Sequence, residues 1–395
     1  MWRPSIRVHV SKGGGRLSPL LPFGGAKRAV GLDIGTTLIK VVEITKTKGA
    51  VEITRAGVHP TPEGTVSEGS VLDPPKVADA VREAMRAAGI RSNEVYAAIA
   101  GDDVVVRHAL FPRMPREELA QAVKWDAGAY IPYPARDASI DYDIIGPPPD
   151  SPDKLEVMIV AAPKKLVQSH VEAMQLAGLY PLALDIQPIT LDRIFRDDGA
   201  ETSGFYADIG GGTTDLAYSD GGVLRFTRIV PLGGNDFTAA VAEATGRAFD
   251  WAEAAKRSSQ VALPAPTQAA VNAQSDAGGP DEAHDHDAVI PKALAGVAAR
   301  LALELRRSLD YCNAQARTRR GAGAPIGSIV LTGGGSRLAG LDKFLENSVG
   351  VRVIHGDPLR NVAAANRPGL ADVLAVHGPS LSVAIGLALR GVEER

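Results

Sequence analysis

Two short segments of the sequence combine an aspartate with glycines and threonines in nearly the same order. The first is Asp33-Ile34-Gly35-Thr36-Thr37, and the second is Asp208-Ile209-Gly210-Gly211-Gly212-Thr213-Thr214. An aspartate that ends a strand can hold the hydration shell of Mg²⁺, a hard cation that prefers oxygen ligands. Glycine lets backbone N–H groups approach phosphate, and threonine hydroxyls add hydrogen-bond donors. The two segments together predict a polyphosphate clamped from both sides, with a metal ion between Asp33 and Asp208.

A third glycine run, Gly333-Gly334-Gly335, follows the apolar residues 329–331 and precedes Ser336 and Arg337. Glycines after a buried strand let the backbone approach a flat ring such as adenine, or a ribose phosphate. The alternative is a plain strand-to-helix turn, which rarely needs three glycines. The sequence contains no Walker loop and no dinucleotide-binding glycine fingerprint, so neither of those phosphate sites is expected.

Apolar runs of period two flank the two aspartate segments and predict strands joined by tight turns. Strands are expected at 29–34, 38–45, 51–58, 94–100 and 104–111, with a helix at 76–89. The opening pattern returns as strands at 205–209, 214–219 and 223–230, followed by helices at 238–245 and 250–257. Because this order recurs at the scale of a domain, the sequence predicts two homologous α/β halves facing each other across a cleft.

A different unit is expected between the two halves, beginning after Pro112 and Pro115. It comprises a helix at 116–130, strands at 140–145 and 155–162, and a helix at 164–178. Such an αββα unit is typical of a small domain inserted into a larger sheet. Towards the end of the chain we expect a long helix at 293–317, a strand at 326–331 and a helix at 341–349.

The composition excludes several classes of function. Lys+Arg 43 against Asp+Glu 46 leaves a net charge of −3, and only 5% of residues are aromatic. The chain therefore lacks both the cationic field and the stacking platforms that nucleic-acid binding requires, and no nucleic acid is expected as a partner. The single cysteine, Cys312, excludes a disulfide framework and fits a reducing cytosol. The apolar runs 155–162 and 382–389 are too short to span a bilayer, so no membrane span is expected.

Two segments lack the patterns of a folded domain. Residues 1–27 contain basic residues and no acidic ones, which predicts a disordered basic tail. Residues 258–291 contain five acidic residues and no lysine or arginine, which predicts a mobile loop. Within this loop, His284-Asp285-His286-Asp287 has the composition of a metal-ligand set, but a solvated polar stretch is the preferred interpretation.

The three glycine-containing segments, in this order, resemble the two phosphate motifs and the adenosine motif of the superfamily of actin, heat-shock chaperones and sugar kinases. A closer resemblance, from Phe23 to Arg390, is to the PilM family of type IV pilus assembly proteins. It is carried by the first aspartate segment with its flanks and by the segments Lys124-Trp125-Asp126, Tyr130-Ile131-Pro132-Tyr133-Pro134, Val160-Ala161-Ala162-Pro163-Lys164, Pro231-Leu232-Gly233-Gly234-Asn235 and Glu304-Leu305-Arg306-Arg307-Ser308-Leu309-Asp310-Tyr311.

The resemblance implies an actin-like, ribonuclease H-like duplicated α/β fold, with two lobes flanking a nucleotide cleft and an inserted subdomain of the FtsA and PilM type. It divides the chain into subdomain 1A (28–113, 184–200 and 365–395), inserted subdomain 1C (114–183), subdomain 2A (201–235 and 325–364) and subdomain 2B (236–324, with the loop 258–291).

The resemblance also implies ATP and Mg²⁺ as cofactors and assigns roles to individual residues. Asp33 and Asp208 match the acids on the metal side, and residues 333–337 match the adenosine loop. Glu253, Lys256 and Arg257 resemble a helix that relatives pack against adenosine, or they form a solvated charge pair. Lys40 either reaches phosphate or lies on a strand edge, and we favour the strand edge. Gln187 stands where the superfamily places a water-orienting residue; because an amide cannot act as a base, tight binding and at most slow hydrolysis of ATP are expected.

The implied function is assembly of the type IV pilus. ATP in the cleft would set the angle between the lobes, and the partner would be the cytoplasmic N-terminal peptide of PilN, an inner-membrane protein. Contact with the membrane would then be indirect, and the protein would lie in the cytoplasm. Self-association is a further partner interaction that the resemblance allows. One alternative is a division protein like FtsA, although no membrane-binding helix follows the last predicted helix. The other is a sugar or acid kinase on the same fold, for which Asp102 and Asp103 are the candidate bases; both are interpreted as turn residues instead.

Overall fold

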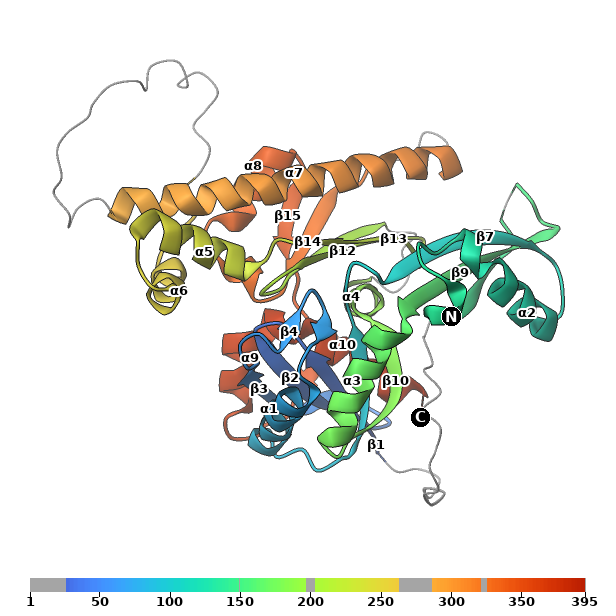
Figure 1. Ribbon diagram of the computed structural model, residues 1–395, viewed down its shortest axis with the longest axis horizontal. Helices are drawn as coiled ribbons and strands as arrows, with labels where there is room; N and C mark the ends of the chain where they lie inside the picture. The colour runs from blue at the N-terminus through green and yellow to red at the C-terminus, as the bar shows by residue number, and fades with distance from the viewer. Residues whose placement is uncertain (1–25, 149, 197–202, 263–285, 321–324, 395) are drawn as a thin grey trace, which may run out of the picture.

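The structure, a computed structural model, describes residues 26–148, 150–196, 203–262, 286–320 and 325–394. The predicted tail 1–27 therefore lies almost wholly outside the described residues, as does most of the predicted loop, including His284 and Asp285. Two lobes are each built on a mixed sheet, one above the other in Figure 1. The strand order is β10-β6-β1-β2-β3-β16 in the first lobe and β13-β12-β11-β14-β15 in the second.

The two sheets repeat one another, as the recurring sequence pattern predicts. In the first lobe β1, β2 and β3 pair antiparallel, and β6 and β10 add on in parallel. In the second lobe β11, β12 and β13 pair antiparallel, and β14 and β15 add on in parallel. The predicted duplicated α/β architecture is therefore confirmed.

The first lobe contains the first sheet and the helices that cover it (Figure 1). Its strands are β1 (Lys27–Ile34), β2 (Leu38–Lys46), β3 (Val51–Pro60), β6 (Glu94–Ile99), β10 (Tyr180–Ile186) and β16 (Ala363–Ala364), with a small hairpin of β4 (Val66–Ser67) and β5 (Ser70–Val71). Its helices are α1 (Pro74–Ala87), α3 (Lys164–Leu176), α4 (Gln187–Phe195), α9 (Leu370–His377) and α10 (Ser382–Glu394).

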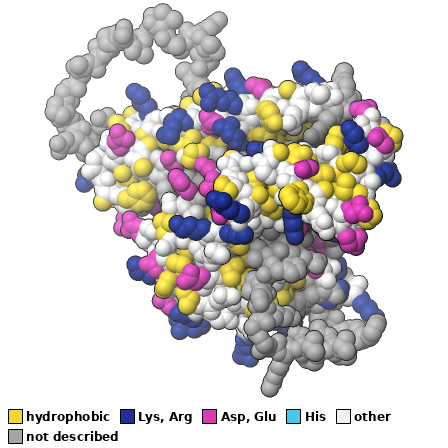
Figure 2. All heavy atoms as spheres, turned by 45° about the vertical axis from the view of Figure 1, so that its right-hand side comes forward, with side chains coloured by type: hydrophobic (Ala, Val, Ile, Leu, Met, Phe, Trp, Pro, Cys, Tyr) yellow, Lys and Arg dark blue, Asp and Glu magenta, His cyan; other side chains and the backbone are white. Residues whose placement is uncertain are grey.

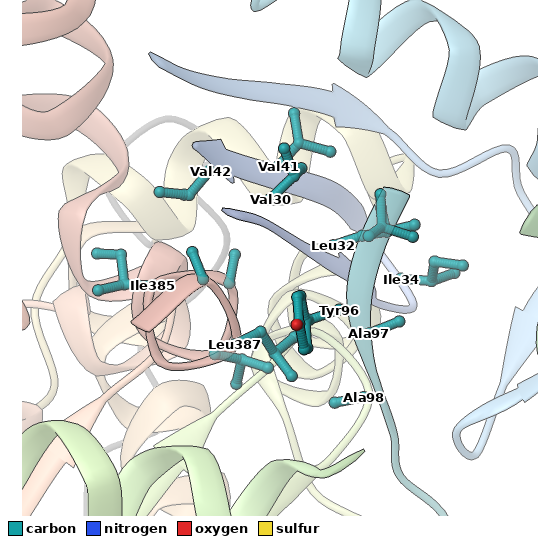
Figure 3. Close-up of a cluster of buried hydrophobic side chains, with 14 of the residues drawn as sticks. Val30, Leu32, Ile34, Val41, Val42, Tyr96, Ala97, Ala98, Ile385 and Leu387 are labelled. Carbon is teal, nitrogen blue, oxygen red and sulfur yellow. The ribbon is translucent and has the colours of Figure 1, made fainter. Parts of the chain in front are cut away.

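Helix α10 is the centre of the first lobe's core. It packs on β1, β2 and α4, and Figure 3 shows Leu387 lying beside Tyr96 of β6. The stretch Leu370–Glu394 is long and apolar enough to cross a membrane by length and composition alone. The sequence prediction of no membrane span rested on the shorter runs 155–162 and 382–389, and it stays a prediction, because length and composition alone do not show a span. A 3₁₀ turn at Gly378–Leu381 separates α9 from α10, and the burial of α10 inside the lobe explains its apolar composition.

Gly31 is the position where β1 and α10 approach most closely. A Cβ there would lie 2.0 Å from the carbonyl oxygen of Ala384 and 2.8 Å from the amide nitrogen of Ala388. Both atoms are backbone, so a Gly31→Ala change must push the helix off the sheet. We expect a loss of about 3 kcal/mol in the free energy of unfolding, measured by urea denaturation. Gly296→Ala, on a helix where a Cβ meets nothing within 4 Å, is the matched control and should not destabilise the protein.

The second lobe contains β11 (Gly204–Ile209), β12 (Thr214–Asp220), β13 (Val223–Val230), β14 (Ser328–Thr332) and β15 (Arg352–His355). Its helices are α5 (Gly234–Thr245), α6 (Phe249–Ser258), α7 (His286–Arg320) and α8 (Leu341–Val349). Helix α5 begins before the predicted residue 238 because the carboxylate of Asp236 accepts a hydrogen bond from the Gly233 amide and caps the first turn.

Helix α7 begins inside the predicted loop and includes Pro291, so the predicted loop boundary at 291 is wrong. The buried side chains of Ile290, Leu294, Val297 and Leu301 follow one another at helical spacing. The apolar stripe that fixes the helix on the core thus begins before the proline. Packing of this stripe outweighs the loss of one backbone hydrogen bond at Pro291.

The inserted unit has a sheet and a small core of its own. It comprises β7 (Val105–Pro112), α2 (Arg116–Asp126), β8 (Ala138–Gly146) and β9 (Lys154–Pro163), with the strand order β7-β9-β8. Strand β7 pairs with β9 rather than with the first sheet, whereas α3 packs on α1 within the first lobe. We therefore propose 105–163 as the limits of this subdomain, in place of 114–183.

Candidate nucleotide site

The turn between β1 and β2 holds Asp33 between two side chains. The turn is closed by a backbone hydrogen bond that the Gly35 amide donates to Leu38 O at 3.1 Å. The register of β1 and β2 places Lys40 opposite Asp33. Lys40 Nζ lies 2.6 Å from Asp33 Oδ2, and Gln187 Nε2 donates to Asp33 Oδ1 at 3.3 Å. The preferred interpretation of Lys40 as a strand-edge residue is therefore wrong, because β2 is an interior strand and the ammonium group points to the acid.

The turn between β11 and β12 repeats this geometry with a different partner for the acid. Gly210 N donates to Thr213 O at 2.8 Å, and the register places Asp215 opposite Asp208. Asp215 is buried, and its Oδ1 atom has no hydrogen-bond partner among the described residues. The lysine of the first turn is thus replaced by a second carboxylate.

The acids of the second turn are poorly compensated by the protein. Burial raises the pKa of Asp208 to about 7; Lys40 opposes this rise and Asp33 adds to it. Burial also raises the pKa of Asp215 well above its usual value, and the charges of Asp208, Asp33 and Asp102 raise it further. A group of carboxylates with one lysine beside it and an unpartnered oxygen favours a hard cation, and oxygen is the ligand that Mg²⁺ prefers.

The protein alone does not form a complete metal cage. Within the described ranges, no three histidine, cysteine, aspartate or glutamate side chains are grouped closely enough to hold a metal ion. Mg²⁺ often keeps several waters and takes further oxygens from phosphates. The arrangement therefore fits a magnesium ion held through water and phosphate, but not a bare protein-bound metal.

The two turns, one from each lobe, are in direct contact. A Cβ on Gly211 would lie 1.9 Å from Thr37 Oγ1, and one on Gly212 would lie 3.2 Å from Thr36 Oγ1. Only glycine fits at the first of these positions. The structure thus brings together the two segments that the sequence singled out, at the ends of β1 and β11.

The start of helix α5 holds the second turn, and helix α6 in turn holds the start of α5. The amides of Gly234 and Asn235 donate to the carbonyls of Gly210 and Gly211, each at 2.8 Å. Lys256 Nζ donates to Gly234 O at 3.0 Å and pairs with Glu253 at 2.6 Å. Lys256 and Glu253 are therefore engaged in holding the start of α5, and their contact with adenosine stays a prediction. Arg257 pairs with Glu253 at 2.8 Å but keeps 75% of its side chain exposed.

The third glycine run lies against the same acid. Gly333 has a φ of +85°, and a Cβ there would lie 2.1 Å from Asp208 Oδ1. Its amide donates to Pro379 O at 3.1 Å, so the 3₁₀ turn of the first lobe closes on this loop. Gly334 and Gly335 follow between Ser380 and Ile209. Burial lowers the pKa of His377, and the charges of Arg337 and Arg257 lower it further.

Three features of the site were missed from the sequence. They are the ion pair between Lys40 and Asp33, the buried carboxylate of Asp215, and the turn at Gly378–Leu381. The signal for Asp215 was its spacing, because it follows Asp208 by seven residues as Lys40 follows Asp33. The residues proposed as kinase bases, Asp102 and Asp103, are exposed. Asp102 lines a cavity of about 200 Å³ together with Asp215.

Comparison with known families decides the relationship. The family model "Type IV pilus assembly protein PilM" matches residues 31–271, more than half of the chain. The chain belongs to the PilM family. Members of the family assemble type IV pili, and the resemblance stated from the sequence is confirmed.

A solved structure agrees with this assignment. A structure described as a PilM-PilN type IV pilus biogenesis complex matches at TM-score 0.74 and 29% identity, over 92% of this chain and 98% of that one. The ethanolamine utilization protein EutJ of Carboxydothermus hydrogenoformans matches at TM-score 0.53 and 17% identity, over 94% and 91% of the two chains, which shows the shared fold.

The division protein FtsA is a second, more distant relative of this PilM-family chain. FtsA of Pseudomonas aeruginosa is 26% identical over 93% of this chain and 90% of its own. The FtsA family model matches residues 206–386, less than half of the chain. These matches support the actin-like fold that the sequence predicted, and they rank the division role below the pilus role.

Proposed function

We propose that this protein is an ATP-binding member of the PilM family that docks the cytoplasmic N-terminal peptide of PilN during type IV pilus assembly. The observation that carries the nucleotide part is the direct contact of the two aspartate–glycine turns beside carboxylates that one lysine compensates only in part. The partner part is supported by the similarity to a PilM-PilN complex over nearly the whole chain. Because PilN is an inner-membrane protein, we infer a cytoplasmic protein that is peripheral to that membrane through its partner.

The nucleotide would lie between the turns. Backbone amides and hydroxyls of 35–37 and 210–214 would bind the phosphates, and the loop 333–337, with Arg257 and Arg337 at its end, would approach the adenosine. Asp33 and Asp208 would hold Mg²⁺ through water. The ion would neutralise phosphate charge that these carboxylates otherwise repel.

The inserted subdomain offers a way to connect the cleft to the partner. His108 on β7 has its Nε2 atom 2.8 Å from Leu224 O on β13, and Glu156 on β9 pairs with Arg225 at 2.5 Å. Burial alone would raise the pKa of Glu156, but its hydrogen bond with His108 and the charge of Arg225 lower it to about 2. The insert is therefore tied to the second lobe by charged contacts.

The insert is also continuous with the first lobe through α3. Because it contacts both lobes, a change in the angle between the lobes must move it relative to one of them. We propose that this motion alters the groove between the first lobe and the insert, where the PilN peptide would bind. ATP would then control peptide affinity without touching the peptide.

Hydrolysis of ATP should be slow. Gln187 is held against Asp33, and an amide can position a water but cannot accept its proton. We expect steady-state turnover on the order of 10⁻³ to 10⁻² s⁻¹, the range of NTPases that lack a complete set of catalytic groups. Phosphate release from the purified protein measures this rate, and turnover on the order of 1 s⁻¹ or faster would contradict the assigned role of Gln187.

Co-purification with PilN tests the partner. We expect full-length PilN to co-purify with this protein. PilN that lacks its cytoplasmic N-terminal peptide should not co-purify. Capture that survives the deletion would contradict peptide docking. Phosphoryl transfer to a compound in a screen of sugars and organic acids would instead favour the kinase alternative, and capture of division proteins in place of PilN would favour the role of FtsA.

A further inference from the structure

A large hollow lies at the end of the first sheet that is opposite the cleft. It has a volume of about 1130 Å³ and is formed by the start of β3, the end of α1, residues 89–93, and residues 367–373 before and within α9. A second hollow of about 530 Å³ continues it along the start of β1, and the two share Arg55, Arg91 and Ser92. Arg28 lines the second hollow and lies five residues before Asp33 on β1. Along the strand this spacing corresponds to ~17 Å between Arg28 and Asp33.

The lining of this hollow, which we call the arginine hollow, is strongly cationic. Six arginines (28, 55, 82, 86, 91 and 367) face two glutamates, Glu43 and Glu83. The chain as a whole carries a net charge of −3, and Figure 2 shows basic and acidic side chains interspersed over the face in view. The excess of four positive charges in one concavity is therefore a local property of this end of the lobe.

Half of these arginines have structural partners. Arg55 donates to Gly89 O at 2.9 Å, and Arg82 donates to Leu176 O at 2.6 Å, so both cap the ends of helices. Arg86 pairs with Glu83. In contrast, Arg28, Arg91 and Arg367 have no hydrogen bond or ion pair from their side chains within the described part of the chain, and all three are exposed. Three guanidinium groups are thus available for a ligand.

The shape and the apolar residues of the arginine hollow narrow the choice of ligand. Its floor includes Met85, Ile90, Leu179, Leu370 and Val373. No phenylalanine, tyrosine or tryptophan lines either hollow, so bases of a nucleic acid would find no stacking surface. The volume exceeds that of most small-molecule pockets. A peptide can present carboxylates to the rim and apolar side chains to the floor.

We propose that the arginine hollow is a docking site for an acidic peptide segment of a partner protein, with glutamate or aspartate side chains on Arg28, Arg91 and Arg367 and apolar side chains on Val373 and Ala177, which are only partly buried. Guanidinium groups bind carboxylates in a bidentate manner, which gives such a contact orientation as well as affinity. This site is separate from the two aspartate–glycine turns, and no residue of the insert, 105–163, lines it.

The test uses the full-length protein and a fluorescein-labelled peptide of alternating Glu and Leu, with a Lys–Leu peptide as the negative probe. We expect the Glu–Leu peptide to bind, with an affinity that falls as salt is added. The double variant Arg91→Glu, Arg367→Glu should weaken binding by about tenfold or more, which corresponds to ~1.4 kcal/mol. Arg300→Glu with Arg306→Glu, a pair of exposed arginines on α7, makes the same change in charge and should leave binding unchanged.

The proposal is overturned if the Glu–Leu peptide does not bind the parent protein, or if the arginine-hollow variant binds it as tightly as the parent does. An equal loss of peptide affinity in the α7 control would also overturn it. So would tighter binding of phosphatidylglycerol vesicles or single-stranded RNA than of the peptide. ATP affinity measured on the same variants should stay unchanged. This readout separates a failed docking site from a misfolded first lobe and from failure of the proposed nucleotide function.

Discussion

Replacing Asp208 with asparagine should remove most of the Mg²⁺ dependence of ATP binding. In the structure the Asp208 carboxylate lies between Asp33, Asp215 and the third glycine run, with Lys40 as the cation beside it. The amide keeps the size of the side chain but loses the charge that would attract the hydrated ion. We expect affinity for Mg·ATP to fall by about tenfold or more (~1.4 kcal/mol or greater).

Metal-free ATP should respond in the opposite direction to the same change. Without Mg²⁺, the Asp208 carboxylate repels the phosphates, so Asp208→Asn should leave this affinity unchanged or increase it. Calorimetric titration with Mg²⁺ and with a chelator measures both affinities. Asp372→Asn, at an exposed position on α9, is the matched control and should behave as the parent protein does. An equal loss with and without Mg²⁺ would contradict a metal-side role for Asp208.

The second large effect is expected at Gly211. Its Cβ would fall 1.9 Å from Thr37 Oγ1, which belongs to the opposite lobe. A Gly211→Ala change must therefore separate the two turns or displace Thr37, at a cost of roughly 1–3 kcal/mol. If that cost is borne by the closed cleft, ATP affinity should fall by about 5- to 150-fold.

A matched glycine is available for this comparison. Gly49 lies in the turn after β2, where a Cβ meets nothing within 4 Å. We expect Gly49→Ala to leave ATP affinity unchanged, and both variants to keep the unfolding midpoint of the parent within a few degrees. Normal ATP binding by Gly211→Ala would show that the turns need not approach each other to bind nucleotide.

The sequence was sufficient for features that depend on local order. The repeated aspartate–glycine segments predicted two equivalent strand–turn–strand units, and the structure places Asp33 and Asp208 at equivalent ends of β1 and β11. The residue types at these turns are dictated by the turn itself, because only small residues allow such approach. Local pattern therefore predicted both the duplicated fold and the centre of the candidate site.

The remaining features depend on pairing and packing across long separations. Lys40 and Asp215 take their places from strand register, which a list of motifs does not contain. The third glycine run is closed by a turn at Gly378–Leu381, more than 40 residues later and from the other lobe. β7 was assigned to the wrong sheet because its apolar pattern fits either of two partners.

The affinity of the PilN N-terminal peptide, measured by fluorescence anisotropy on one preparation with and without Mg·ATP, tests the central claim most directly. The account predicts that the peptide binds and that its affinity changes several-fold when nucleotide is added. It also predicts that Gly211→Ala removes this change while the peptide still binds. A peptide that does not bind, or that binds equally in both nucleotide states of the parent protein, would contradict nucleotide-controlled docking.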